Sequence, residues 1–130
     1  MTPPVMVYVR DVLASLEFYE AALQVDRRHF DEDGSYGEVE SGDVRIGFVA
    51  EWHAAANLRA PFRRNELRDD PAGFQLYATV GDVDAVYARA LEAGGVPVEP
   101  PAEKPWGRRA IVRDPDGILF EIGMDAPATA

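Results

Sequence analysis

The sequence contains no cysteine among its 130 residues. Structural disulfides, thiolate metal sites and cysteine nucleophiles are therefore excluded. No apolar run approaches the roughly 20 residues that cross a bilayer. Residues 1–10 also lack the basic segment and long apolar stretch of a secretory signal. We therefore expect a cytoplasmic protein with no membrane partner.

Basic residues are also scarce, with 13 Lys and Arg against 23 Asp and Glu and a formal net charge of −10. A nucleic-acid partner is not expected, because its phosphates require a basic surface. The acidic groups are spread along the chain, which supports solubility and is compatible with cationic ligands. The sequence has neither a Gly-rich phosphate loop nor a serine or threonine nucleophile in a recognisable setting.

The hydrophobic pattern predicts strands and helices in the same order in both halves of the chain. Asp11 and Asp82 are the expected N-caps of two helices, at about 12–23 and from about 83 to a stop at Gly94-Gly95. The expected strands are 5–9, 28–30, 36–40, 45–50, 74–80, 96–98, 109–113 and 118–123. A Pro-rich loop is expected to follow residue 98, and Asp114-Pro115-Asp116-Gly117 is the expected last turn.

The two halves match each other along the sequence. Val9-Arg10-Asp11-Val12 corresponds to Val80-Gly81-Asp82-Val83 at a shift of 71 positions. This repeat predicts an α+β fold of two βαβββ modules that form a curved mixed sheet around a cleft. We expect one domain over residues 1–130, with module 1 at about 4–51, a connection at about 52–73 and module 2 at about 74–124. A helical turn is expected near Ala54.

Several motifs together make the chain similar to one known superfamily. They are Val9-Arg10-Asp11-Val12, Ser15-Leu16-Glu17-Phe18-Tyr19, Asp114-Pro115-Asp116-Gly117 and Phe120-Glu121-Ile122. The chain resembles the vicinal oxygen chelate superfamily, which contains glyoxalase I, extradiol dioxygenases, and fosfomycin- and bleomycin-resistance proteins. The resemblance covers nearly the whole chain and is closest in character to the metal-free bleomycin-resistance branch. It implies a homodimer, because related single-domain proteins pair their modules between chains.

In metal-dependent members of the superfamily, four strands each point one ligand into the cleft. The resemblance implies that these positions fall at Pro4, Gly47, Gln75 and Glu121. Glu121 is a good ligand and Gln75 offers only a neutral amide oxygen, whereas proline and glycine side chains offer nothing. A firmly held divalent ion normally needs three or more protein ligands. We therefore expect no metal and no other cofactor.

The two histidines, His29 and His53, leave one alternative for a metal. His53 follows Glu51 by two positions, and on a strand these side chains would share a face and could form a displaced site. The other interpretation is an exposed loop pair.

Candidate ligand-contacting residues come from both halves. Glu121 would be an acid, a base or an anchor for a cationic ligand, or else a carboxylate bonded to Gln75 or to backbone. Trp106 would be either a stacking platform at the pocket mouth or a plug over the core. Similar reasoning applies to the further aromatic residues Tyr36, Phe48, Trp52 and Phe62.

Four arginines make the connection between the halves locally basic, and they would either meet an anionic substrate or pair with acidic groups on the surface. They are Arg59, Arg63, Arg64 and Arg68.

The sequence thus predicts a metal-free pocket that binds a small aromatic or amphipathic molecule, such as an antibiotic, by sequestration. The alternative is an enzyme of glyoxalase type, a lyase, isomerase or dioxygenase, with an unusual ligand set or with Glu121 as a metal-free catalyst.

Overall fold

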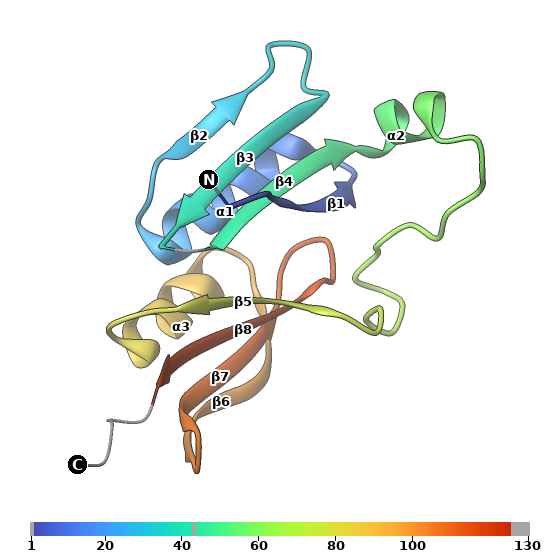
Figure 1. Ribbon diagram of the computed structural model, residues 1–130. Helices are drawn as coiled ribbons and strands as arrows, with labels where there is room; N and C mark the ends of the chain where they lie inside the picture. The colour runs from blue at the N-terminus through green and yellow to red at the C-terminus, as the bar shows by residue number, and fades with distance from the viewer. Residues whose placement is uncertain (1, 43, 126–130) are drawn as a thin grey trace.

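The computed structural model describes residues 2–42 and 44–125, and its elements follow the predicted order twice (Figure 1). The helical turn expected near Ala54 is a short helix, α2. The elements of the first half are β1 (Val5–Val9), α1 (Val12–Leu23), β2 (Arg27–Phe30), β3 (Tyr36–Ser41), β4 (Val44–Ala50) and α2 (Glu51–Asn57). Those of the second are β5 (Gln75–Thr79), α3 (Val83–Glu92), β6 (Val96–Lys104), β7 (Gly107–Arg113) and β8 (Leu119–Asp125).

Each module has its own four-stranded mixed sheet. The strand orders are β1-β4-β3-β2 and β5-β8-β7-β6. In both sheets the first strand of the module runs parallel to the last, and the other pairs are antiparallel. The predicted α+β fold of two βαβββ modules is therefore confirmed, with two separate sheets in place of the single curved sheet.

The duplication extends to the helix caps. The side chain of Asp11 accepts a hydrogen bond from the Ala14 backbone N–H at 3.1 Å, and Asp82 accepts one from Ala85 at the same distance. Both caps satisfy one of the unpaired N–H groups that every helix start leaves. The expected N-caps are therefore confirmed at equivalent positions of the repeat. No helix within residues 2–42 and 44–125 is both long and apolar enough to cross a bilayer.

The region after Val98 differs from the sequence prediction. The expected Pro-rich loop is part of β6, which continues to Lys104. β6 is an edge strand, and its pairing with β7 shifts register twice, between Pro97 and Glu99 and between Glu99 and Ala102. Edge positions and bulges tolerate proline because no ladder hydrogen bond is lost there. Trp106 therefore lies in a tight hairpin turn and not in a long loop.

The core is shared by the two modules. Helix α1 packs on the first sheet and α3 on the second, and the two helices contact each other. The ring of Tyr19 on α1 lies 5.4 Å from the ring of Phe48 and 5.1 Å from that of Phe120. Phe48 is fully buried in this core, and its contact with ligand stays a prediction. The residue belongs to the alternating set on β4 that faces α1.

One buried hydrogen bond joins α1 to the last turn of module 2. Tyr19 Oη donates to Asp114 Oδ2 at 2.6 Å, and both side chains are fully buried. Asp114 Oδ1 accepts from the backbone N–H groups of Asp116 and Ile118 at 2.9 and 3.0 Å. Burial nevertheless raises the pKa of Asp114 to about 6, although the Tyr19 hydroxyl opposes this shift.

This pair predicts a pH-dependent cost for Tyr19→Phe. The folded-state pKa of Asp114 lies above that of an unfolded aspartate, so protonation of Asp114 stabilises the fold and this contribution is lost as the pH rises from about 4 to about 6. Above that range, Tyr19→Phe leaves a buried carboxylate oxygen without its donor, at a cost of about 1–3 kcal/mol. The cost is expected to be smaller at pH 5, where Asp114 is mostly protonated.

Urea unfolding of both proteins at pH 5 and pH 8 checks this expectation. Tyr87→Phe is the matched control, because among the described residues the Tyr87 hydroxyl has no hydrogen-bond partner. Equal destabilisation by Tyr19→Phe at the two pH values would contradict a hydrogen bond from Tyr19 to an Asp114 carboxyl group that is protonated at pH 5.

Candidate functional site

Each sheet has one face turned away from α1 and α3, which we call its outer face. In module 1 the outer face carries alternate residues of three strands. Gly37 points inward, since a Cβ there would lie 2.7 Å from a methyl group of Leu16 on α1. Tyr36 and Glu38 therefore point outward. They meet Gly47 on β4, because Glu38 is the register partner of Gly47.

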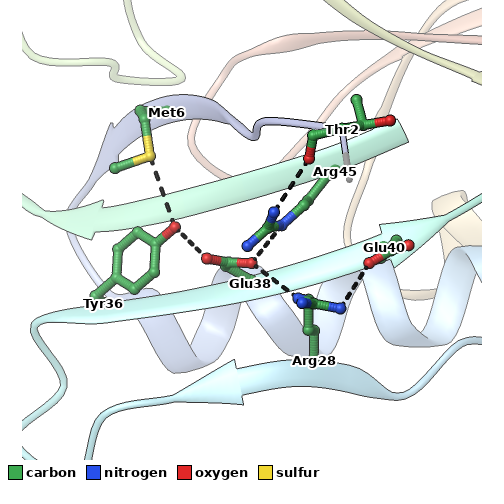
Figure 2. Close-up of polar contacts among 7 residues, drawn as sticks. All are labelled: Thr2, Met6, Arg28, Tyr36, Glu38, Glu40 and Arg45. Carbon is green, nitrogen blue, oxygen red and sulfur yellow. Dashed lines mark hydrogen bonds and ion pairs between the residues drawn. The ribbon is translucent and has the colours of Figure 1, made fainter. Parts of the chain in front are cut away.

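A hydrogen-bonded network centred on Glu38 occupies this outer face (Figure 2). Tyr36 Oη donates to Glu38 Oε2 at 2.6 Å, and Arg45 Nε donates to Oε1 at 2.7 Å. Arg28 Nε lies 3.4 Å from the same Oε1, and its Nη1 donates to Glu40 at 3.0 Å. Both carboxylate oxygens of Glu38 therefore have donors, although the side chain is only 9% exposed.

The network changes the acidity of its two central groups. Burial raises the pKa of Glu38, but the hydrogen bonds from Arg45 and Tyr36 outweigh burial and hold it below its ordinary value. Burial and the hydrogen bond to Glu38 raise the pKa of Tyr36 well above its ordinary value. Glu38 is therefore the ionised acceptor and Tyr36 the neutral donor of the pair.

Gly47 makes room for the Tyr36 hydroxyl. A Cβ at position 47 would lie 2.5 Å from Tyr36 Oη and 2.8 Å from Met6 Sδ, both closer than real contacts allow. The position that the superfamily resemblance assigns to a metal-ligand side chain thus holds the hydroxyl of a neighbouring tyrosine.

A cavity of about 580 Å³ opens beside this hydroxyl, between the outer face of module 1 and α2. Tyr36 belongs to its wall, whereas Gln75, Trp106 and Glu121 do not. The lining residues are Met6, Tyr8, Asp31, Ser35, Tyr36, Val49, His53, Ala54, Asn57 and Leu58. The wall combines apolar and aromatic surface with a few polar atoms, which is the usual composition of a small-molecule site.

The outer face of module 2 places Glu121 beside a buried arginine. Arg109 Nε lies 3.8 Å from Glu121 Oε2, and the guanidinium carbon lies 5.4 Å from the centre of the Tyr77 ring. Arg109 Nη1 donates to the Met124 carbonyl oxygen at 2.9 Å, but its buried Nε has no hydrogen-bond partner among the described residues. Glu121 is thus paired with a cation and not with Gln75 or backbone. Nothing in the sequence pattern singled out Arg109 or Glu38.

The four positions assigned to metal ligands form two equivalent pairs in the duplicated fold, Pro4 with Gly47 in module 1 and Gln75 with Glu121 in module 2. Met6, two residues after Pro4, pairs with Gly47, and Tyr77, two residues after Gln75, pairs with Glu121. Their side chains do not fit a divalent ion. Only Glu121 is an anionic donor, and the Arg109 cation lies beside it. Residues 2–42 and 44–125 contain no group of three His, Cys, Asp or Glu that could hold a metal.

The other predicted residues lie apart from one another. Glu51 and His53 are both on α2, two positions apart, so they point in nearly opposite directions and the shared strand face is wrong. Glu51 pairs with Arg64 at 3.2 Å, and Arg68 pairs with Glu66.

Of the aromatic candidates outside the cavity wall, Phe62 packs on Tyr8, with ring centres 4.9 Å apart. Trp52 and Trp106 are exposed, on α2 and in the β6–β7 turn. Their contacts with ligand stay predictions.

Two βαβββ modules, each with one open sheet face, define the glyoxalase and bleomycin-resistance class of fold. A profile of the Glyoxalase/Bleomycin resistance protein/Dioxygenase superfamily matches residues 3–122, and the chain belongs to this superfamily.

The chain is also 28% identical over 116 residues to "Putative glyoxylase CFP32" of Mycobacterium bovis and of Mycobacterium tuberculosis. The match covers 87% of this chain but only 40% of those relatives.

Solved structures share the fold at low sequence identity. A glyoxalase-related enzyme from Fulvimarina pelagi has a TM-score of 0.80 at 19% identity, covering 100% of this chain and 93% of the other. A glyoxalase/bleomycin resistance protein/dioxygenase family enzyme from Burkholderia phytofirmans PsJN has a TM-score of 0.68 at 21% identity, covering 94% and 96%. These similarities establish the fold alone.

The contact at Gly47 predicts a coupled pair of substitutions. Gly47→Ala forces the Tyr36 hydroxyl and the Met6 sulfur to move, and overpacking of this kind costs about 1–3 kcal/mol. In the double variant with Tyr36→Phe the closest clash is gone. The double variant is therefore expected to lose less free energy of unfolding than the two single variants lose together. Urea unfolding of the four proteins measures this coupling.

Gly73→Ala is the control, because a Cβ at position 73 has no described atom within 4 Å. If Gly47→Ala were no more destabilising than Gly73→Ala, the tight fit of Tyr36 over Gly47 would be wrong.

Proposed function

We propose that the protein binds a small amphipathic molecule, such as an antibiotic or a metabolite, without a firmly held metal, and that its function is sequestration. The supporting observation is the Tyr36 hydroxyl over Gly47, beside a cavity of about 580 Å³. The groups that face this cavity suit recognition of an organic molecule better than coordination of a divalent ion.

A second candidate is an activity of glyoxalase type, that of a lyase, isomerase or dioxygenase. The half-buried Glu121 beside Arg109 supports this candidate, because a carboxylate in such a place can act as a general base. It would act without a metal, since the neighbouring Gln75 supplies only an amide. The names of the superfamily relatives agree with either candidate.

The proposal predicts the metal content of the purified protein. Elemental analysis is expected to find Zn, Ni, Fe and Mn far below one per chain, because only one of the four positions has an anionic ligand. A thermal-shift screen of amphipathic compounds is expected to find ligands that raise Tm, since a ligand of the native state stabilises it. One tightly held, EDTA-sensitive metal per chain would overturn the sequestration proposal and favour the enzyme.

The proposed functional unit is a homodimer. Large apolar side chains are exposed on both modules, and Val5 and Met6 on β1 are each about half exposed. Others are Trp52, Phe74, Trp106 and Met124. Apolar surface of this kind is typical of protein–protein or ligand contacts.

Light scattering at micromolar concentration tests the assembly. We expect about twice the 14.3 kDa mass of the chain. Val5→Lys would place a charge in the apolar contact and is expected to shift the mass toward that of one chain. A monomer for the unchanged protein over the micromolar range would contradict the proposed dimer.

A further inference from the structure

The hydrogen-bonding groups in the wall of the cavity beside Tyr36 favour some ligands over others. The inference drawn from them rests on the proposed binding function. None of the described residues that line the cavity is an arginine or a lysine. Its one acidic residue is Asp31, and His53 is its one further titratable group besides the tyrosines Tyr8 and Tyr36. One amide N–H of Asn57 is already used, since Nδ2 donates to the His53 carbonyl oxygen at 2.8 Å.

The Tyr36 hydroxyl has a single proton, and two acceptors lie near it. Glu38 Oε2 is at 2.6 Å and Met6 Sδ at 3.6 Å. An ionised carboxylate at the shorter distance is much the stronger acceptor, so the proton points to Glu38. The rest of the Tyr36 Oη surface therefore carries lone pairs only, and the Met6 sulfur beside it is also an acceptor.

Two arginines on the other carboxylate oxygen hold Glu38 in place as the acceptor for Tyr36. Arg45 and Arg28 both approach Oε1, which leaves Oε2 to Tyr36. Arginine has donors and no acceptor, so these two side chains keep Glu38 ionised and oriented. Figure 2 shows the resulting order, with the arginines on one side of the carboxylate and the Tyr36 hydroxyl and Met6 on the other.

We propose that this cavity selects ligands with an N–H donor head group, a primary amine or ammonium, and that Glu38 is the positioning residue that turns Tyr36 into an acceptor. The amine would donate to Tyr36 Oη, and its apolar body would lie along Met6, Val49 and Leu58. A carboxylate head group would face these lone pairs, and none of the described lining residues is an arginine or a lysine that would compensate its charge. The cationic preference is thus assigned to the Tyr36–Glu38 pair and not to Glu121.

Three probes with a phenyl group on a chain of three or four methylene groups test this on the unchanged protein. They are phenylbutylamine, phenylbutyltrimethylammonium, which is a cation without N–H groups, and phenylbutyrate. NMR titration of the Met6 methyl signal reports binding in the cavity, because Met6 lines it. The amine is expected to bind at least about tenfold more tightly than either other probe, as the loss of one charged hydrogen bond implies.

Glu38→Gln provides a change that a merely structural role would not produce. The arginines require the amide oxygen of Gln, so its NH₂ group must turn to Tyr36. Tyr36 Oη then accepts from the amide and points its own proton into the cavity. The preference is expected to invert, with phenylbutyrate binding more tightly than phenylbutylamine. Tyr36→Phe is expected to bring the amine to the affinity of the trimethylammonium probe, without any gain for the carboxylate.

Glu40→Gln is the matched control, because it removes the same charge from the same strand. Glu40 pairs with Arg28 and does not contact Tyr36. It is expected to leave the order of the three probes unchanged. If Glu40→Gln altered the order as Glu38→Gln does, a general charge effect would replace the proposed hydrogen bond.

The remaining outcomes separate this inference from the proposed function. Equal binding of all three probes to the unchanged protein would overturn the acceptor role of Tyr36 and leave the binding function intact. Absence of any Met6 response at millimolar amine would overturn both the inference and the assignment of this cavity as the binding site. Circular dichroism and Tm of each variant establish that it is folded before its titration is interpreted.

Discussion

The contact between α1 and the last turn of module 2, made through Tyr19 and Asp114, is the constraint on which the rest of the arrangement depends. It fixes the inner faces of both sheets as one shared core, and a core of that kind leaves little space for charged groups other than the hydrogen-bonded Asp114. The ionised side chains that function needs must therefore lie on the outer faces. Glu38 and Arg109 do so, each buried by its own neighbours and not by the core.

The duplicated backbone carries two different chemistries on these faces. Gly47 and Gly123 lie on the equivalent strands β4 and β8, and each leaves room for a tyrosine hydroxyl, from Tyr36 and from Tyr77. In module 1 the hydroxyl is bonded to a carboxylate, whereas in module 2 it lies near a guanidinium. Because glycine has no side chain, the polarity of each outer face is set by side chains of the neighbouring strands that occupy the space over it.

Much of the fold could be predicted from the sequence, because its signals are local. The caps Asp11 and Asp82 and the repeat at a shift of 71 positions follow from single residues and short spacings. The second half of β6, after Val98, was missed because prolines weigh against a strand unless its edge position is known. The site was predicted only in part. Pairing Glu38 with Arg45 requires the β3–β4 register, which alternation of side chains alone does not supply.

The small contribution of the Glu38 ion pairs to stability supports a role for Glu38 in ligand recognition. A buried ion pair contributes little to stability, since the cost of removing charges from water roughly cancels their attraction, so Glu38 with its arginines is not needed to hold the sheet together. A divalent ion requires three or more metal-binding side chains, whereas an ammonium group needs a lone pair in the right direction and apolar walls for the rest of the ligand. The Tyr36 hydroxyl, whose proton is committed to Glu38, lies over the position that the superfamily resemblance assigns to a metal ligand and offers an acceptor without formal charge. On the proposed function, such an acceptor suits an organic amine better than a divalent ion.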